Sequence, residues 1–328
     1  MEHGISNAIK LASNETPWGP VPSVAAKLTE AITGINRYAD HGAAELRGRL
    51  AEWIGVNADQ VTVGCGSVGL LQQLLLTYVD PGDEVIYPWR SFEVYPVFTQ
   101  LVAGVDITTE LVDEAFDLDA VVAAVTPKTK LILLANPNNP TGTALPMSDY
   151  RKLLEQVPND VMVTIDEAYR EFMDPSLGDP VADLLPDFPN LVVLRTFSKA
   201  QGLAALRVGY ATASPEVIQT IDKTLFPFAV NGLAQIGAMA SIDAHDEVME
   251  RVSQIKAERD RVAGVLRGRG YTIPESQANF VWLALGDRSD DVYLELETAG
   301  VVTRLFPGEG IRVTMSTSEE NDRFLAAL

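Results

Sequence analysis

The stretch that decides the fold reads Asn190-Leu-Val-Val-Leu-Arg-Thr-Phe-Ser-Lys199-Ala-Gln-Gly202. Its apolar, β-branched first half predicts a buried strand, and Gly202 predicts a turn just beyond it. A second strand-like run, Asp160-Val-Met-Val-Thr-Ile-Asp166, ends in an aspartate. Lys199 and Asp166 therefore stand just past or at the carboxyl ends of two predicted strands, where open α/β sheets bind their ligands.

The pair of residue types points to a particular chemistry. A lysine amine can form a Schiff base with an aldehyde cofactor, and an aspartate can keep a pyridine nitrogen protonated so that the ring accepts electrons. A lone lysine is more often a solvated surface charge, and an Asp166-x-x-Tyr169 spacing arises by chance. The ordered pair, each member placed after a buried strand, favours a pyridoxal phosphate site.

A third segment supports this interpretation. The run Lys130-Leu-Ile-Leu-Leu-Ala predicts a strand that leads into Asn136-Pro-Asn-Asn139-Pro-Thr-Gly142. The two prolines exclude regular helix or strand there, and Gly142 permits a tight turn. An ordinary Asn-Pro turn would look the same; the functional interpretation is a rigid loop that presents an asparagine amide to the cofactor ring.

A glycine-rich turn suits a phosphate. The run Gly64-Cys-Gly-Ser-Val-Gly69 lies between a predicted strand and a predicted helix, where small residues let backbone N–H groups approach an anion. Such a turn would fit any nucleotide phosphate, but G-x-x-x-x-G-K-S/T and a clear Rossmann arrangement are both missing from the sequence. Thr196, Ser198 and Arg207 would add hydroxyls and one positive charge around the same dianion.

Strand-like and helix-like runs alternate along the middle of the chain. Predicted strands cover residues 61–64, 84–87, 130–135, 161–165, 191–195 and 206–212, and predicted helices cover 68–79, 92–102 and 147–156. This alternation predicts an α/β fold with a mostly parallel sheet between helices. A long amphipathic helix at 248–269, strands at 279–285 and 310–315 and a helix near 289–299 predict a smaller α+β domain.

Composition narrows the function classes. The net charge of −20 and a pI near 4.5 argue against nucleic-acid or anionic-membrane partners, which require clustered positive charge. One cysteine, Cys65, and three histidines give no zinc constellation, so no metal is expected. No apolar run approaches the roughly 20 residues of a membrane span. Without a basic-then-apolar leader, a cytoplasmic location is the expectation.

These segments together resemble the fold-type I pyridoxal phosphate aminotransferases of the histidinol-phosphate aminotransferase-like group. The resemblance runs from Lys10-Leu-Ala-Ser-Asn-Glu15 through Asn36-Arg-Tyr-Ala-Asp40 to Arg312-Val-Thr. Within the group, Trp89-Arg-Ser-Phe-Glu-Val-Tyr-Pro96 and Pro227-Phe-Ala-Val230 are most similar to actinobacterial aromatic amino acid (phenylalanine) aminotransferases.

The resemblance implies how the chain is divided. Residues 31–235 would form the large cofactor-binding domain and 236–328 the small one, which residues 1–30 would complete. It also implies a homodimer with shared active sites, because Tyr38 resembles a residue that reaches the phosphate of the neighbouring subunit. Nine residues precede Lys10, fewer than the arm with which relatives clasp the second subunit, and a dimer is still expected.

The resemblance also implies the cofactor contacts. Lys199 would anchor the aldehyde and shift a proton between Cα and C4′, and Asp166 would pair with the ring nitrogen. Asn139 and Tyr169 would contact the 3-hydroxyl oxygen, and Phe92 would stack on the ring. The phosphate cradle would comprise Gly66, Ser67, Thr196, Ser198 and Arg207.

Substrate contacts follow in the same way. Arg312 would clamp the α-carboxylate with help from Asn14. Arg304 matches an arginine that contacts the distal phosphate of histidinol phosphate, or it serves the side-chain carboxylate of glutamate. Phe228 belongs to an apolar segment, 226–230, that suits an aromatic ring. Hydrophobic pockets discriminate modestly, so overlap between the two activities is expected.

The predicted activity is ping-pong transfer of an amino group between an aromatic L-amino acid and a 2-oxo acid such as 2-oxoglutarate. Histidinol-phosphate transamination on the same scaffold is the nearest alternative. An amino acid decarboxylase of similar fold is a second one. A non-catalytic regulator that kept the fold is the third, and the intact Lys199–Asp166 pair argues against it.

Overall fold

A large mixed sheet forms the centre of the computed structural model, which describes residues 7–328. Its strands lie in the order β2-β9-β8-β7-β6-β3-β4-β5. The bounds are β2 (Val61–Gly64), β3 (Glu84–Trp89), β4 (Val105–Val112), β5 (Ala115–Phe116), β6 (Thr129–Ala135), β7 (Met162–Asp166), β8 (Leu191–Thr196) and β9 (Gly209–Thr212). The run from β8 to β4 is parallel, whereas β2, β9 and β5 are antiparallel to their neighbours. The predicted fold class is confirmed.

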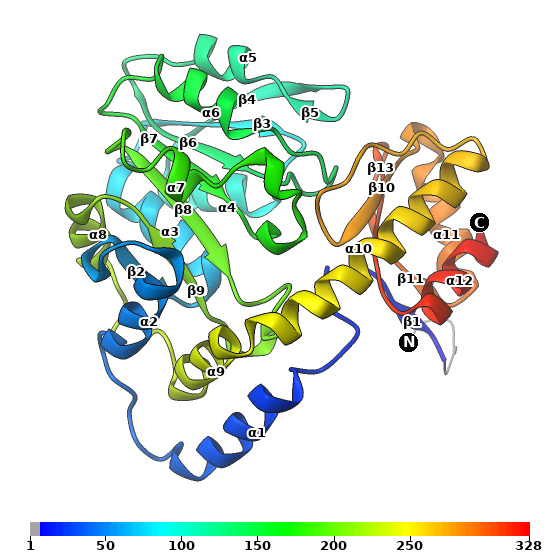
Figure 1. Cartoon of the computed structure of the whole chain (residues 1–328). Coiled ribbons are helices and arrows are strands. Elements are labelled where there is room, and N and C mark those ends of the chain that lie inside the picture. The colour runs from blue at the N-terminus through cyan, green and yellow to red at the C-terminus, as the bar shows by residue number, and fades with distance from the viewer. Residues whose placement is uncertain (1–6) are drawn as a thin grey trace.

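The centre of this large sheet is apolar along whole strands. Leu131, Ile132, Leu133 and Leu134 of β6 are all fully buried, as expected for parallel strands covered on both faces. Helices flank the sheet (Figure 1). They are α2 (Ala44–Ile54), α3 (Gly66–Tyr78), α4 (Val94–Leu101), α5 (Leu118–Ala123), α6 (Met147–Leu154), α7 (Pro180–Asp183) and α8 (Pro215–Asp222).

A small antiparallel sheet lies beside the large one. It consists of β10 (Phe280–Ala284), β13 (Gly310–Thr314) and β12 (Arg304–Phe306), with α11 (Ser289–Thr298) and α12 (Ser318–Ala327) packed nearby. The 24-residue helix α10 (His245–Gly268) runs from the large-sheet side to this small sheet (Figure 1).

The start of the chain contacts both parts. Strand β1 (Ile9–Lys10) pairs in parallel with β11 (Val301–Val302), next to the small sheet. Helix α1 (Pro22–Ala31) instead packs against α9 (Gly232–Asp243). The domain boundaries at 30 and 235 stay predictions, and residues 1–6 of the predicted N-terminal segment lie outside the described residues.

Two strand predictions need correction. The strand expected at 206–212 begins only at Gly209, because Ala204–Leu206 form a 3-10 turn and Arg207 has a φ of 59°. Strand β4 was not predicted, since its apolar and polar residues are mixed without a long apolar run and all lie at half-buried or exposed positions. Within residues 7–328 no helix has the length and apolar character needed to cross a bilayer.

Candidate active site

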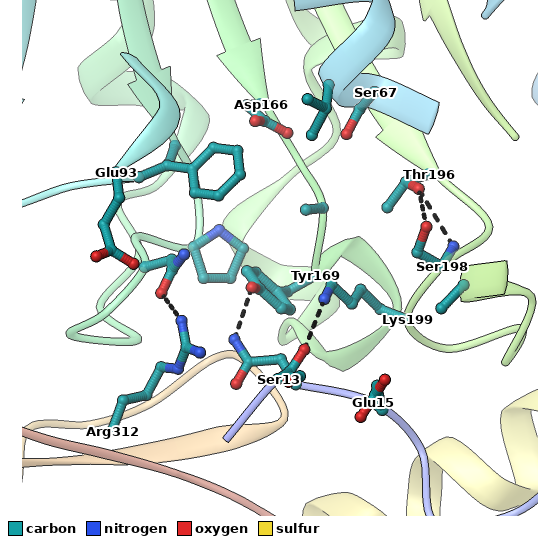
Figure 2. Close-up of a pocket in the computed structure, with 18 of the residues that line it drawn as sticks. Ser13, Glu15, Ser67, Glu93, Asp166, Tyr169, Thr196, Ser198, Lys199 and Arg312 are labelled. Carbon is teal, nitrogen blue, oxygen red and sulfur yellow. Dashed lines mark hydrogen bonds between the residues drawn. The ribbon is translucent and has the colours of Figure 1, made fainter. Parts of the chain in front are cut away.

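A pocket of about 400 Å³ opens between the carboxyl ends of β6, β7 and β8, the start of α3 and the small sheet. Figure 2 shows Asp166 and Ser67 on the large-sheet side of the pocket and Arg312 on the opposite side. The predicted site residues that line it are Asn14, Ser67, Phe92, Asn139, Asp166, Tyr169, Thr196, Ser198, Lys199, Arg207, Arg304 and Arg312. Segments that are up to 300 residues apart in the sequence are thus brought into one cavity.

Asp166 is the last residue of β7, and its carboxylate is buried at the edge of the pocket. Burial raises the pKa of Asp166 to about 7, although the Ala168 N–H and the Lys199 ammonium oppose the rise. Oδ1 of Asp166 is buried and has no hydrogen-bond partner among residues 7–328. A buried, unpartnered carboxylate oxygen is costly, so this atom is suited to a donor that the chain itself does not supply.

Lys199 lies on the loop after β8 and extends into the pocket (Figure 2). Its Nζ donates a hydrogen bond to the carbonyl of Ser13 at 3.2 Å. Burial, together with the nearby Arg312 and Arg207, lowers the pKa of Lys199 to about 8, although Glu15 acts in the opposite direction. A neutral amine is therefore accessible near neutral pH, as a nucleophile or a proton acceptor requires.

A buried hydrogen-bond chain fixes the hydroxyl of Tyr169. Asn14 Nδ2 donates to Tyr169 Oη at 2.8 Å, and Asn14 Oδ1 accepts from Thr314 Oγ1 at 2.9 Å. The Asn14 backbone N–H also donates to Thr314 Oγ1, at 2.9 Å. Thr314 thereby determines which way the Asn14 amide points. Asn14 has a φ of 54°, a left-handed conformation that asparagine adopts more readily than most residues.

Arg312 on β13 faces the pocket from the small sheet. One of its terminal nitrogens donates to Asn139 Oδ1 and the other to the carbonyl of Ala12 at 2.6 Å. Its Nε is buried without a partner. Burial lowers the pKa of Arg312, and Arg304 contributes in the same direction. A guanidinium with an unused donor matches the geometry of a carboxylate ligand.

The opposite end of the pocket can hold an anion. Ser67 lies in the first turn of α3, where backbone N–H groups are free to bind an anion. Arg207 reaches this turn because Gly66 lacks a side chain; a Cβ there would lie 2.6 Å from Arg207 Nη2. Thr196 Oγ1 donates to Ser198 Oγ at 2.9 Å, and Arg207 Nη1 lies 3.4 Å from the same oxygen. Gly66 itself does not line the cavity.

Two predicted residues lie outside this pocket in a single chain. Tyr38 and Phe228 pack against each other with ring centroids 4.8 Å apart, and Tyr38 is 87% exposed. Phe228 has a φ of 58°, and its ring contacts Tyr38 and His41 rather than the pocket. The expected aromatic wall is therefore not formed by Phe228 within its own chain.

The structure also adds residues that the sequence patterns missed. Tyr95 is fully buried and supports the Phe92 ring edge to face, at 5.8 Å between centroids. Glu93 and Glu15 line the pocket and bring negative charge to it. Thr314 orients Asn14. The role of Thr314 depends on a contact across 300 residues, which no local sequence signal could have identified, whereas Tyr95 lies only three residues from Phe92.

Comparisons with known proteins agree with this geometry. The family described as aminotransferase class I and II matches residues 6–328. An aromatic amino acid aminotransferase of Thermobifida fusca is 50% identical over 317 residues, which are 96% of this chain and 88% of the relative. One from Mycobacteroides abscessus is 48% identical over 98% of this chain and 92% of its own length.

A solved structure agrees as well. Histidinol-phosphate aminotransferase from Sinorhizobium meliloti, in complex with pyridoxal-5'-phosphate, superimposes with a TM-score of 0.94 at 28% identity. The alignment covers all of this chain and 91% of that one. The predicted family is confirmed: the chain belongs to the class I and II aminotransferases.

Proposed function

We propose that this aminotransferase transfers an amino group between an aromatic L-amino acid and a 2-oxo acid such as 2-oxoglutarate, with pyridoxal phosphate as cofactor. The observation that carries the proposal is the convergence of Lys199, Asp166 and Arg312 on one cavity. The aromatic preference is supported by relatives near 50% identity that are named aromatic amino acid aminotransferases.

The residues present fit pyridoxal phosphate. The orphaned Oδ1 of Asp166 would accept a hydrogen bond from the ring nitrogen, and the missing side chain at Gly66 lets Arg207 reach the turn where the phosphate would lie. Ser67, Thr196, Ser198 and Arg207 would hold that phosphate. When bound, the cofactor supplies an aldehyde and an electron-accepting ring.

The chain's own residues supply the remaining functions. Lys199 would hold the aldehyde until substrate arrives, and its free amine would then move the proton from the substrate Cα to C4′, and from C4′ to Cα in the second half-reaction. Arg312 would bind the α-carboxylate, positioned by Asn139 and by the carbonyl of Ala12. Tyr169, held by Asn14, would stabilise the ring oxygen.

We also propose a homodimer in which Tyr38 completes the site of the other subunit. The support is a set of exposed apolar side chains of the kind that normally marks an interface. These are Ile32, Ile35, Tyr38, Phe226 and Phe228, which are 42–87% exposed. The domain division at residues 30 and 235 and a cytoplasmic location belong to the same proposal. Sedimentation at micromolar concentration should give twice the chain mass; a monomer that turns over at the full rate would contradict the shared site.

Histidinol-phosphate transamination is the second candidate, because Arg304 lines the pocket and could contact a distal phosphate. Rapid-mixing absorbance spectra of the cofactor-loaded enzyme with L-phenylalanine and with L-histidinol phosphate separate the two. Faster conversion of the cofactor to its amine form with phenylalanine is expected. Faster conversion with histidinol phosphate would reverse the assignment, and failure with both would favour decarboxylation.

A further inference from the structure

Two arginines lie directly opposite each other on the small sheet. Arg304 of β12 and Arg312 of β13 are paired in register, and both line the pocket. Like charges at directly opposite positions destabilise a sheet unless each has its own partner. Arg312 has Asn139 and Ala12, as described above. Arg304 has Glu93, whose Oε1 lies 2.7 Å from Arg304 Nη2.

Glu93 comes from a distant part of the chain. It immediately precedes α4, next to Phe92, and it meets Arg304 across 211 residues of sequence. In Figure 2 Glu93 lies above Arg312, on the same side of the pocket. The Glu93–Arg304 pair thus forms the part of the wall that a substrate side chain would meet once Arg312 holds the α-carboxylate.

The ion pair between Glu93 and Arg304 can be broken at low cost, so that Arg304 can bind a different anion. The two side chains are 37% and 48% exposed, and ion pairs in contact with water add little stability. The guanidinium of Arg304 also lies 5.8 Å from the Phe306 ring. This contact does not depend on which anion the arginine binds.

We propose that Glu93 is a specificity-determining residue of the transamination site. It acts as the counter-ion of Arg304 while a neutral aromatic side chain is bound, and it yields Arg304 to the distal carboxylate of a dicarboxylic substrate. This inference rests on the proposed function, because it explains how one site takes a neutral donor and an acidic acceptor. Without Glu93, an aromatic ring would be bound next to an unpaired cation.

A second ion pair offers a matched control. Arg90, at the end of β3, pairs with Glu309 of the turn before β13, and Arg90 contacts Phe306 at 5.4 Å. This pair joins the same two parts of the chain as Glu93–Arg304, yet neither Arg90 nor Glu309 lines the pocket. Replacing Glu309 tests whether loss of an ion pair that only holds these two segments together is enough to change ligand binding.

The experiment measures dissociation constants by calorimetry on the cofactor-loaded enzyme. Its two ligands are glutarate, a dicarboxylate, and 3-phenylpropionate, an aromatic monocarboxylate. In Glu93→Gln, the ratio of the glutarate constant to the phenylpropionate constant should fall about fivefold, the order of magnitude of one exposed ion pair. Glu309→Gln should leave the ratio as in the wild type. Combining Glu93→Gln with Arg304→Gln should abolish this fall in the ratio.

An unchanged ratio in Glu93→Gln would overturn the proposal, and so would an equal shift in Glu309→Gln. Its failure is distinguishable from failure of the proposed function. If the wild type does not convert its cofactor with phenylalanine, the aromatic assignment falls whatever the ratio does. If it converts but the ratio does not move, only the role of Glu93 falls.

Discussion

Two neighbouring carboxylates at the end of β7 are buried to a similar degree and bonded in opposite ways. Glu167 is fully paired: Arg195 contacts its carboxylate at 2.7 Å, and Arg170 lies 3.5 Å away. Asp166 keeps one oxygen without a partner, and its nearest functional cation, Lys199, acts on it through charge alone. Arg195 lies on β8 and Lys199 on the loop after it, whereas Arg170 begins the 3-10 turn Arg170–Phe172 that follows β7.

The difference separates a structural carboxylate from a functional one. Burial raises the pKa of Glu167, and Arg195 and Arg170 oppose that rise. At Asp166 the Ala168 N–H and Lys199 oppose the rise only in part, so its pKa is still raised to about 7. Such incompletely compensated burial is frequent where a ligand completes the site.

The pair of Asp166 and Lys199, which interact through charge alone, should matter most for turnover. Replacing Lys199 with alanine should reduce transamination on the order of 10⁶-fold, as for loss of a covalent catalytic residue, because no other lysine of residues 7–328 lines the pocket. Steady-state assays with phenylalanine and 2-oxoglutarate measure this. Lys152→Ala, which removes an exposed surface lysine, is the control. Near-normal turnover in Lys199→Ala would remove the basis of the proposed function.

The buried ion pair between Glu167 and Arg195 should matter most for stability. Glu167→Gln leaves Arg195 buried without its main counter-ion, and breaking a buried pair from one side costs about 3–5 kcal/mol. Urea unfolding of the cofactor-free protein at pH 7 measures the loss. Glu155→Gln, at an exposed position, should have no comparable effect. A cost below that of an ordinary surface substitution would mean that the pair does not hold the strand end.

Asp166→Asn should change the free energy of unfolding in the opposite direction and stabilise the cofactor-free protein. Folded Asp166 keeps its proton until about pH 7, whereas the unfolded chain loses it near pH 4. The wild-type contribution to stability is therefore full below pH 4 and is lost as the pH rises to about 7. Above pH 7 the cofactor-free variant should be more stable than the wild type, by at most about 4 kcal/mol for a shift of about three pKa units.

Urea unfolding of both proteins at pH 4 and pH 8 tests this prediction. The advantage of Asp166→Asn should be small at pH 4 and largest at pH 8. The same variant should lose turnover when loaded with cofactor. A difference in stability that does not change with pH would show that Asp166 titrates normally, and the contrast with Glu167 would disappear.

The smallest effect on stability is expected at Asp179, the more exposed carboxylate beside Arg195 and Arg170. Burial opposes ionisation of Asp179, yet Arg195 and Arg170 lower its pKa. The side chain is 34% exposed, so Asp179→Asn should cost only about 0.2–1 kcal/mol at pH 7. Asparagine can still cap the Val181 N–H. The cost should fade below about pH 4; a loss as large as that of Glu167→Gln would instead indicate one cooperative network.

Patterns in the sequence revealed the parts of the fold that are locally encoded. The apolar runs of β6, β7 and β8 identified the centre of the large sheet, because buried parallel strands must be apolar along their whole length. Strand β4 escaped notice because polar residues interrupt its apolar ones and none of its residues is fully buried. The two-residue strands β1, β5 and β11 are too short to carry any pattern.

The residues of the site likewise divide into those that the local sequence identifies and those that it does not. Lys199 and Asp166 could be identified from their positions after predicted strands. The functions of Arg312 and Asn14 rested on family resemblance, since nothing local indicates that they approach the same ligand. Glu93 and Thr314 were missed because their significance lies in contacts made by folding. Phe228 was assigned to the pocket wall from its apolar neighbours, but its backbone conformation directs it to Tyr38.

The hydrogen bond between Asn14 and Thr314 joins residues 300 positions apart and has a consequence for biosynthesis. Asn14 precedes every strand of the large sheet in the chain, whereas Arg312 and Thr314 follow all of them. A nascent chain that already contains every strand of the large sheet still has no clamp for a carboxylate. Because Arg312 also helps to lower the pKa of Lys199, a chain that ends before Arg312 would lack both the carboxylate clamp and part of what makes the lysine amine reactive.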